Sequence, residues 1–145
     1  MKRVRNLLPV LGLCLAASAC GGSEPVTLAE IVVYPEAVPI DGENIVAESV
    51  AESIRAGAGD EAVDVEIRMY TVPNDTLWED VKLFYATETG SADWDASGEL
   101  TSETDFVSTI GWTRGGQMRP QAFVVAFSPD PLGGPPFLIL MLVSE

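Results

Sequence analysis

An alternation of apolar and polar side chains constrains the fold of this chain more than any other feature. Apolar residues occupy every second position from Val63 to Met69, and the positions between them hold Asp, Glu and Arg. This period of two is typical of a β-strand with one face in a core and the other toward water. The run from Phe137 to Val143 is apolar throughout, too short to span a membrane, and typical of a central strand buried on both sides. The chain is therefore expected to fold around a β-sheet.

Two helices are expected to accompany this sheet. Apolar residues recur at four-residue spacing within residues 43–56, which indicates an amphipathic helix. A second helix is expected between a capping box of Thr76 and Glu79 and its end at Gly90. Further strands are expected over residues 31–34, 106–113 and 121–127, with loops over 91–105 and 128–136.

The order of these elements predicts the fold class. The three strands at the end of the chain are joined by short loops, which favours antiparallel pairing. We therefore expect an α+β fold: a two-layer sandwich with a mostly antiparallel sheet of about four to five strands and two helices on one face. The aromatic residues of the second helix, Trp78 and Tyr85 among them, are expected to pack on the sheet.

The N-terminus has the pattern of an export signal. Lys2, Arg3 and Arg5 precede an apolar run from Leu7 to Ala17, which is too short to remain as a spanning helix. Two small residues, Ser18 and Ala19, then stand directly before Cys20, and glycines follow it. This segment resembles the lipobox of bacterial lipoproteins, although position 17 holds Ala instead of a large aliphatic residue. The resemblance implies that acyl chains, palmitate among them, are attached to Cys20.

This interpretation divides the chain into three parts. Residues 1–19 are expected to be a signal peptide, residues 20–28 a lipid-anchored tether, and residues 29–145 a single α+β domain. The alternative is an ordinary cleaved signal, because Ala-Ser-Ala is also a small-x-small cleavage site. Either way the domain is expected outside the cytoplasm, and the lipobox places it on the cell membrane or an outer membrane, facing the periplasm or the exterior.

Composition excludes several classes of function. Three of the eight Lys and Arg residues precede Cys20, which leaves five against 22 Asp and Glu residues. So acidic a surface repels nucleic acid, and we expect no nucleic-acid partner. The chain has no histidine, and its two cysteines lie at or before position 20, so no catalytic histidine, histidine-bound metal or disulfide of the domain is expected.

One polar segment imitates a calcium-binding loop. From Asp93 to Thr101, oxygen-bearing side chains fall at positions one, three, five and nine, with glycine at position six, as in an EF-hand. Position twelve should be glutamate but is Thr104. A calcium-dependent accessory or adhesion module is therefore an alternative function, and no residue is assigned as a metal ligand.

Two other groups of residues are weaker candidates. Abundant carboxylates would allow a carboxylate-based hydrolase, yet no spacing pairs them, so no catalytic residue is assigned and an enzyme is not the favoured interpretation. Arg114 and Arg119 flank the turn expected between the strands over 106–113 and 121–127, and Trp112 lies near them in the sequence. Together they could form an exposed recognition point for a ligand.

A second resemblance concerns the domain. The Tyr34-Pro35-Glu36-Ala37 segment, Phe84-Tyr85 and Asp93-Trp94 resemble a small domain of uncharacterised bacterial lipoproteins, in which glycines stand at positions 36 and 93. It implies the fold class and no activity. The function expected from the sequence is a lipid-anchored, non-catalytic binding or assembly module of the cell envelope. Its expected partners are the membrane, through the anchor, and an envelope protein, and no cofactor is expected.

Overall fold

The computed structural model describes residues 24–42, 52, 56, 63–115 and 119–145. The expected signal peptide and Cys20 lie outside the described residues. The helix expected over 43–56 also lies outside them, apart from Glu52 and Ala56, which are both helical.

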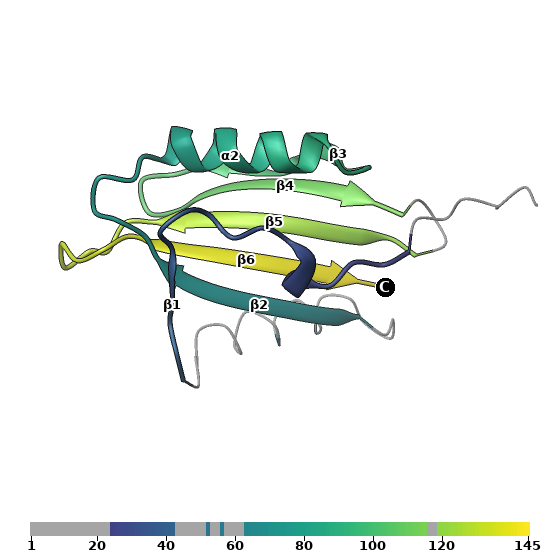
Figure 1. Ribbon diagram of the computed structural model, residues 1–145, viewed down its shortest axis with the longest axis horizontal. Helices are drawn as coiled ribbons and strands as arrows, with labels where there is room; N and C mark the ends of the chain where they lie inside the picture. The colour runs from purple at the N-terminus through teal and green to yellow at the C-terminus, as the bar shows by residue number, and fades with distance from the viewer. Residues whose placement is uncertain (1–23, 43–51, 53–55, 57–62, 116–118) are drawn as a thin grey trace, which may run out of the picture.

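A six-stranded antiparallel sheet forms most of the described fold, with one α-helix, α2, beside it (Figure 1). The expected α+β class agrees with this architecture, but the expected four to five strands are too few. Strand order across the sheet is β1-β2-β6-β5-β4-β3. The elements are η1 (Leu28–Glu30, a 3-10 helix), β1 (Val38–Pro39), β2 (Asp64–Thr71), α2 (Trp78–Gly90), β3 (Asp95–Glu103), β4 (Ser108–Arg114), β5 (Gln121–Ser128) and β6 (Phe137–Ser144).

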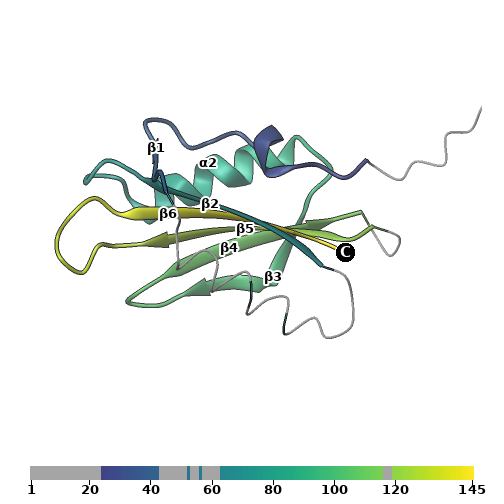
Figure 2. The same cartoon turned by 90° about the horizontal axis from the view of Figure 1, so that it is seen from below.

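The core lies on one face of the sheet. The N-terminal segment (residues 24–37), which includes η1, covers this face together with α2, as Figure 2 shows. Three leucines of β6 point into it, and none is more than 1% exposed: Leu138, Leu140 and Leu142. The side chains between them on β6 are only half-buried, so the expectation that this strand is fully buried on both sides is wrong. Its central position, between β2 and β5, is confirmed.

Residues 31–34 do not form the expected strand. Ile31, Val33 and Tyr34 instead pack against the core, beside α2. The Tyr34 amide donates a hydrogen bond to the hydroxyl of Tyr85 at 3.1 Å, so a side chain takes the place of a strand partner. The edge strand beside β2 is β1, which pairs with the last two residues of β2, and β3 forms the other edge.

The segment expected as a loop over 91–105 contains a strand, β3. It pairs with β4, with an irregularity between Ser97 and Ser102. The Thr101 hydroxyl donates to the Ser97 carbonyl at 2.9 Å within this irregularity. Most β3 side chains are exposed, so the strand has no buried face to impose an apolar period on its sequence.

The start of α2 also differs from expectation. Leu77 precedes the first helical residue, and no side chain caps the helix. Thr76 instead donates its amide to the Pro73 carbonyl, and Glu79 forms an ion pair with Lys82. The aromatic side of the helix packs on the sheet as expected, since Trp78 stacks on Phe127 of β5 with ring centroids 6.1 Å apart.

Candidate functional site

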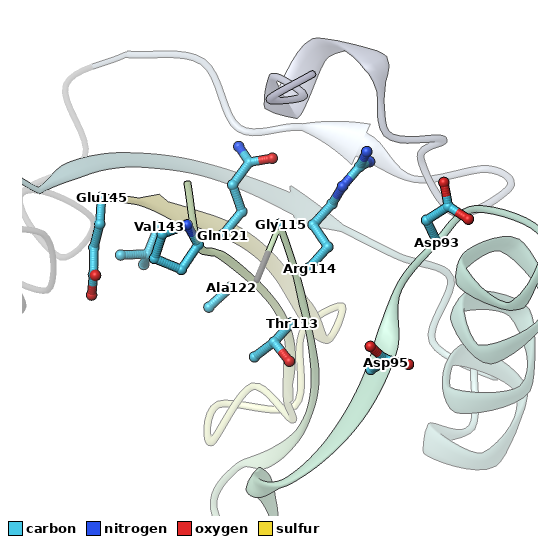
Figure 3. A pocket seen from close by; sticks show the side chains of 10 residues that line it. Asp93, Asp95, Thr113, Arg114, Gly115, Gln121, Ala122, Val143 and Glu145 are labelled. Carbon is cyan, nitrogen blue, oxygen red and sulfur yellow. The ribbon is translucent and has the colours of Figure 1, made fainter. Parts of the chain in front are cut away.

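A hollow lined by charged and polar residues lies where β4 leads into β5 (Figure 3). Its volume is about 350 Å³. The antiparallel register brings Arg114 of β4 opposite Gln121 of β5, and Gln121 opposite Ser144 of β6. Ten residues line it: Asp93, Asp95, Thr113, Arg114, Gly115, Pro120, Gln121, Ala122, Val143 and Glu145.

The N-terminal segment is fastened to this end of the sheet by Gln121, which is 3% exposed. Its side-chain oxygen accepts the Val26 amide at 3.0 Å, and its side-chain nitrogen donates to the Val26 carbonyl at 2.8 Å. The same nitrogen donates to the Ser144 hydroxyl at 2.9 Å. The three residues after Thr27 form η1, in which Leu28 is 1% exposed. The last residues of the expected tether therefore belong to the folded domain.

Arg114 is the basic residue of the hollow's lining. Its guanidinium carbon lies 5.3 Å from the centre of the Trp94 ring, which is a cation–π arrangement. One of its nitrogens donates to the Glu24 carbonyl at 3.4 Å. The arginine therefore joins β4, the residues before β3 and the N-terminal segment.

The expectation that Arg114, Arg119 and Trp112 form an exposed recognition point at this turn is partly wrong. Arg119 is exposed and Arg114 half-buried, but Trp112 is only 4% exposed. The Trp112 ring stacks on Phe123 inside the core, with centroids 5.7 Å apart. The aromatic partner of the arginine is Trp94 instead, because it precedes β3 and that strand lies next to β4.

The charge of the hollow suits a cationic ligand. Three carboxylates, Asp93, Asp95 and Glu145, line it against a single guanidinium. Figure 3 shows the Asp93 and Glu145 side chains at opposite sides of the hollow. Ala122 and Val143 add apolar side chains to the lining. The lining therefore offers a small amine both carboxylates and apolar contacts.

The EF-hand spacing does not produce an EF-hand loop. From Asp95 onward the segment is the extended strand β3, which spreads its oxygen-bearing side chains along the sheet edge. Within the described part of the chain, no three Asp, Glu, Cys or His side chains come together as metal ligands.

Among the described residues, the pKa values of two carboxyl groups are shifted, and both shifts favour the ionised form. The hydrogen bond from the Thr27 backbone, with a second from its hydroxyl, lowers the pKa of Glu30. The Trp78 indole N–H at 2.9 Å, followed by Lys82 at 3.0 Å, lowers the pKa of Glu103. A general acid needs a raised pKa, so these two groups are suited to accept hydrogen bonds and not to donate a proton.

Gln121 is the residue of this site that the sequence analysis missed. It is the polar first residue of an otherwise apolar segment, and it comes directly after a proline. A polar side chain in an otherwise buried strand needs hydrogen-bond partners, so the position of Gln121 already indicated a buried polar contact.

Comparisons with family models, with curated proteins and with solved structures each found no match to this chain. Among the described residues, no helix combines the length and the apolar character that crossing a membrane requires.

Proposed function

We propose that this chain is exported, acylated on Cys20 and held at a membrane surface of the cell envelope, where its domain acts as a non-catalytic binding or assembly module. The basic start, the short apolar run and the small residues before Cys20 support the anchor. The acidic composition supports a protein partner over a nucleic acid.

The observation that carries the anchor is the sequence pattern before Cys20, and the hydrogen bonds between Gln121 and the Val26 backbone fix which end of the sheet that anchor would reach. Five residues separate Cys20 from Val26. Even fully extended, this stretch reaches only about 20 Å at about 3.3 Å per residue. An anchor on Cys20 would therefore keep the β4–β5 end of the sheet close to the bilayer.

The charges at this end favour a covalent anchor over electrostatic attachment. Asp93, Asp95 and Glu145 surround the hollow there. Carboxylates are repelled by anionic headgroups, so charge alone would not hold this end at a bacterial membrane. Two acyl chains on Cys20 would be enough to attach the protein stably to a membrane despite this repulsion.

Mass spectrometry of the mature N-terminus tests the anchor. We expect the chain to begin at Cys20 and to carry acyl chains, and to be found in the membrane fraction. The Cys20→Ser variant should lose both properties, whereas Cys14→Ser should keep them. An unmodified Cys20, or the intact unprocessed chain in the cytosol, would overturn the proposal.

Pull-down from detergent-solubilised envelope tests the binding role. We expect a partner that survives washing and is retained with and without calcium ions. Turnover of a hydrolase substrate that a single Asp or Glu substitution abolishes would replace the binding role with catalysis. Retention only in the presence of calcium would favour the calcium-dependent module.

A further inference from the structure

Exposed apolar side chains lie at the end of the sheet opposite the β4–β5 hollow that Gln121 lines. Seven large apolar residues are exposed among the described residues, and five of them lie at this end. The three loop residues Leu77, Phe106 and Leu132 are 62%, 81% and 93% exposed. We call these three side chains the apolar tips. Val38 and Val107 are the other two exposed apolar residues there.

The tips come from three loops that meet at one end. Figures 1 and 2 both show the β2–α2, β3–β4 and β5–β6 connections at the end away from the β4–β5 turn. The Ser128 hydroxyl donates to the Phe106 carbonyl at 3.0 Å, which joins two of these loops. The Val72 amide donates to the Pro136 carbonyl at 3.1 Å, which joins the third.

Local hydrogen bonds hold two of the tips in place. The Thr104 hydroxyl donates to the Val107 carbonyl at 2.7 Å and accepts the Val107 amide at 3.0 Å, which closes the turn around Phe106. The Asp130 carboxylate accepts the amides of Leu132 at 2.9 Å and Gly134 at 3.1 Å. The exposed side chains thus stand on ordered turns, and a partner that buries them loses less conformational entropy on binding.

The charges around the tips indicate the chemistry of what covers them. An aspartate lies within two residues of each tip: Asp75, Asp105 and Asp130. The three loops, residues 72–77, 104–107 and 129–136, contain no Lys or Arg. An anionic bilayer is repelled by such a rim. A protein surface with an apolar depression bordered by Lys or Arg complements both the tips and the rim.

We propose that the apolar tips form a docking surface for a protein partner of the envelope whose binding face is apolar with a basic border. This inference rests on the proposed binding role and names its surface and partner class. It does not depend on the anchor, because it is tested in a chain that lacks Cys20.

The test uses the full chain carrying Cys20→Ser and a fluorescent amphipathic helical peptide of leucine and lysine. Binding is followed by fluorescence anisotropy. A second peptide, with glutamate in place of lysine, and vesicles of phosphatidylglycerol serve as the other arms. Burying a Leu or Phe side chain contributes about 1.5–3 kcal/mol, so Phe106→Ser or Leu132→Ser should weaken lysine-peptide binding about tenfold or more.

Two exposed apolar residues elsewhere provide matched controls. Leu83 on α2 is 68% exposed and Val32 is 52% exposed, and neither is in the three loops. Leu83→Ser and Val32→Ser should change the affinity less than about twofold. All four positions are exposed, so the circular dichroism spectra should stay unchanged.

Each outcome decides the proposal. Saturable binding of the lysine peptide that weakens with the tip variants, and with added salt, supports it. No binding, equal binding of the glutamate peptide, or equal weakening by Leu83→Ser overturns it. Vesicle binding that the tip variants abolish would replace the protein partner with a lipid surface. A failed acylation experiment at Cys20 would leave these results intact, so the two proposals fail separately.

Discussion

The side chain of Gln121 is predicted to be the main fastening of the N-terminal segment. It forms two hydrogen bonds with the Val26 backbone and one with Ser144 while 3% exposed. Gln121→Leu keeps the approximate volume and removes all three bonds. At about 1 kcal/mol each, their loss lowers the free energy of unfolding by about 3 kcal/mol. The half-buried Val26 groups regain some water, so the expected range is about 2–4 kcal/mol.

Ser144→Ala is the matched control, since it removes one of the three bonds and leaves the other two. It should cost about 1 kcal/mol. Combining it with Gln121→Leu should add almost nothing, because the Gln121 variant has already lost that bond. Urea unfolding measures all three free energies, and for a domain of this size the Gln121 variant should melt about 10 °C lower.

Amide hydrogen exchange locates the effect. In the original chain the Val26 amide is bonded to the Gln121 oxygen and should exchange slowly, and in Gln121→Leu it should exchange much faster. A loss of less than about 1 kcal/mol, or unchanged exchange at Val26, would refute the reasoning that this side chain fastens the segment.

Three further predictions concern the core and the far end of the sheet. A Cβ added to Gly111 would lie 2.5 Å from the Leu100 Cβ, so Gly111→Ala should destabilise the fold by about 1–3 kcal/mol in urea unfolding. The additional change Leu100→Gly, which removes that Cβ, should recover part of the loss. Because the pKa of Glu103 is lowered in the folded chain, its hydrogen bond to Trp78 stabilises the fold above the ordinary glutamate pKa and is lost as pH falls through the lower folded value. This loss should appear as a step in Trp fluorescence against pH, and the step should be absent in Glu103→Gln. Burial raises the pKa of Tyr85, so its phenol should stay protonated at pH values where an exposed tyrosine ionises, as ultraviolet absorbance would show. Tyr85→Phe should lower the free energy of unfolding by about 1–3 kcal/mol because the Tyr34 amide loses its hydrogen-bond acceptor.

The strands that the sequence predicted are those with one face in the core. β2, β4, β5 and β6 all follow their expected segments within one or two residues. The side chains on one face of each of these strands are buried against α2 and the N-terminal segment. This burial places apolar residues at alternating positions, a pattern that can be recognised in the sequence. The antiparallel pairing of β4, β5 and β6 was predicted because their connections are too short for parallel crossovers.

The two local errors share a cause. β3 has no core face, so its existence depends on pairing with β4, a non-local interaction that leaves no local pattern. Residues 31–34 carry an apolar pattern, but it serves packing beside α2 instead of pairing in the sheet. The apolar character of Ile31, Val33 and Tyr34 reflects their contact with the core, and it does not show that their backbone has no strand partner.

Three residues of the candidate site could be selected from the sequence, but their arrangement could not. Arg114, Asp93 and Asp95 were each selected from the sequence, and the structure places all three around one hollow. The pairing of the arginine with Trp94 depends on β3 lying beside β4, which the sequence analysis had not predicted. Gln121 was missed because its partner, Val26, lies 95 residues away in the chain.

An antiparallel sheet places its connections at two opposite ends, and here the two ends differ in a way that links both proposals. The end with Gln121 receives the N-terminal segment, and the end with the apolar tips receives three other loops. Strands of eight residues separate these ends by about 25 Å at about 3.3 Å per residue. If Cys20 is anchored, its short reach keeps the first end near the bilayer, and a sheet that stands upright on it places the tips about 25 Å farther from that membrane. In this orientation the apolar tips face the aqueous envelope, where a protein partner would meet them, and the aspartates beside them disfavour the alternative in which the domain lies flat on anionic lipid.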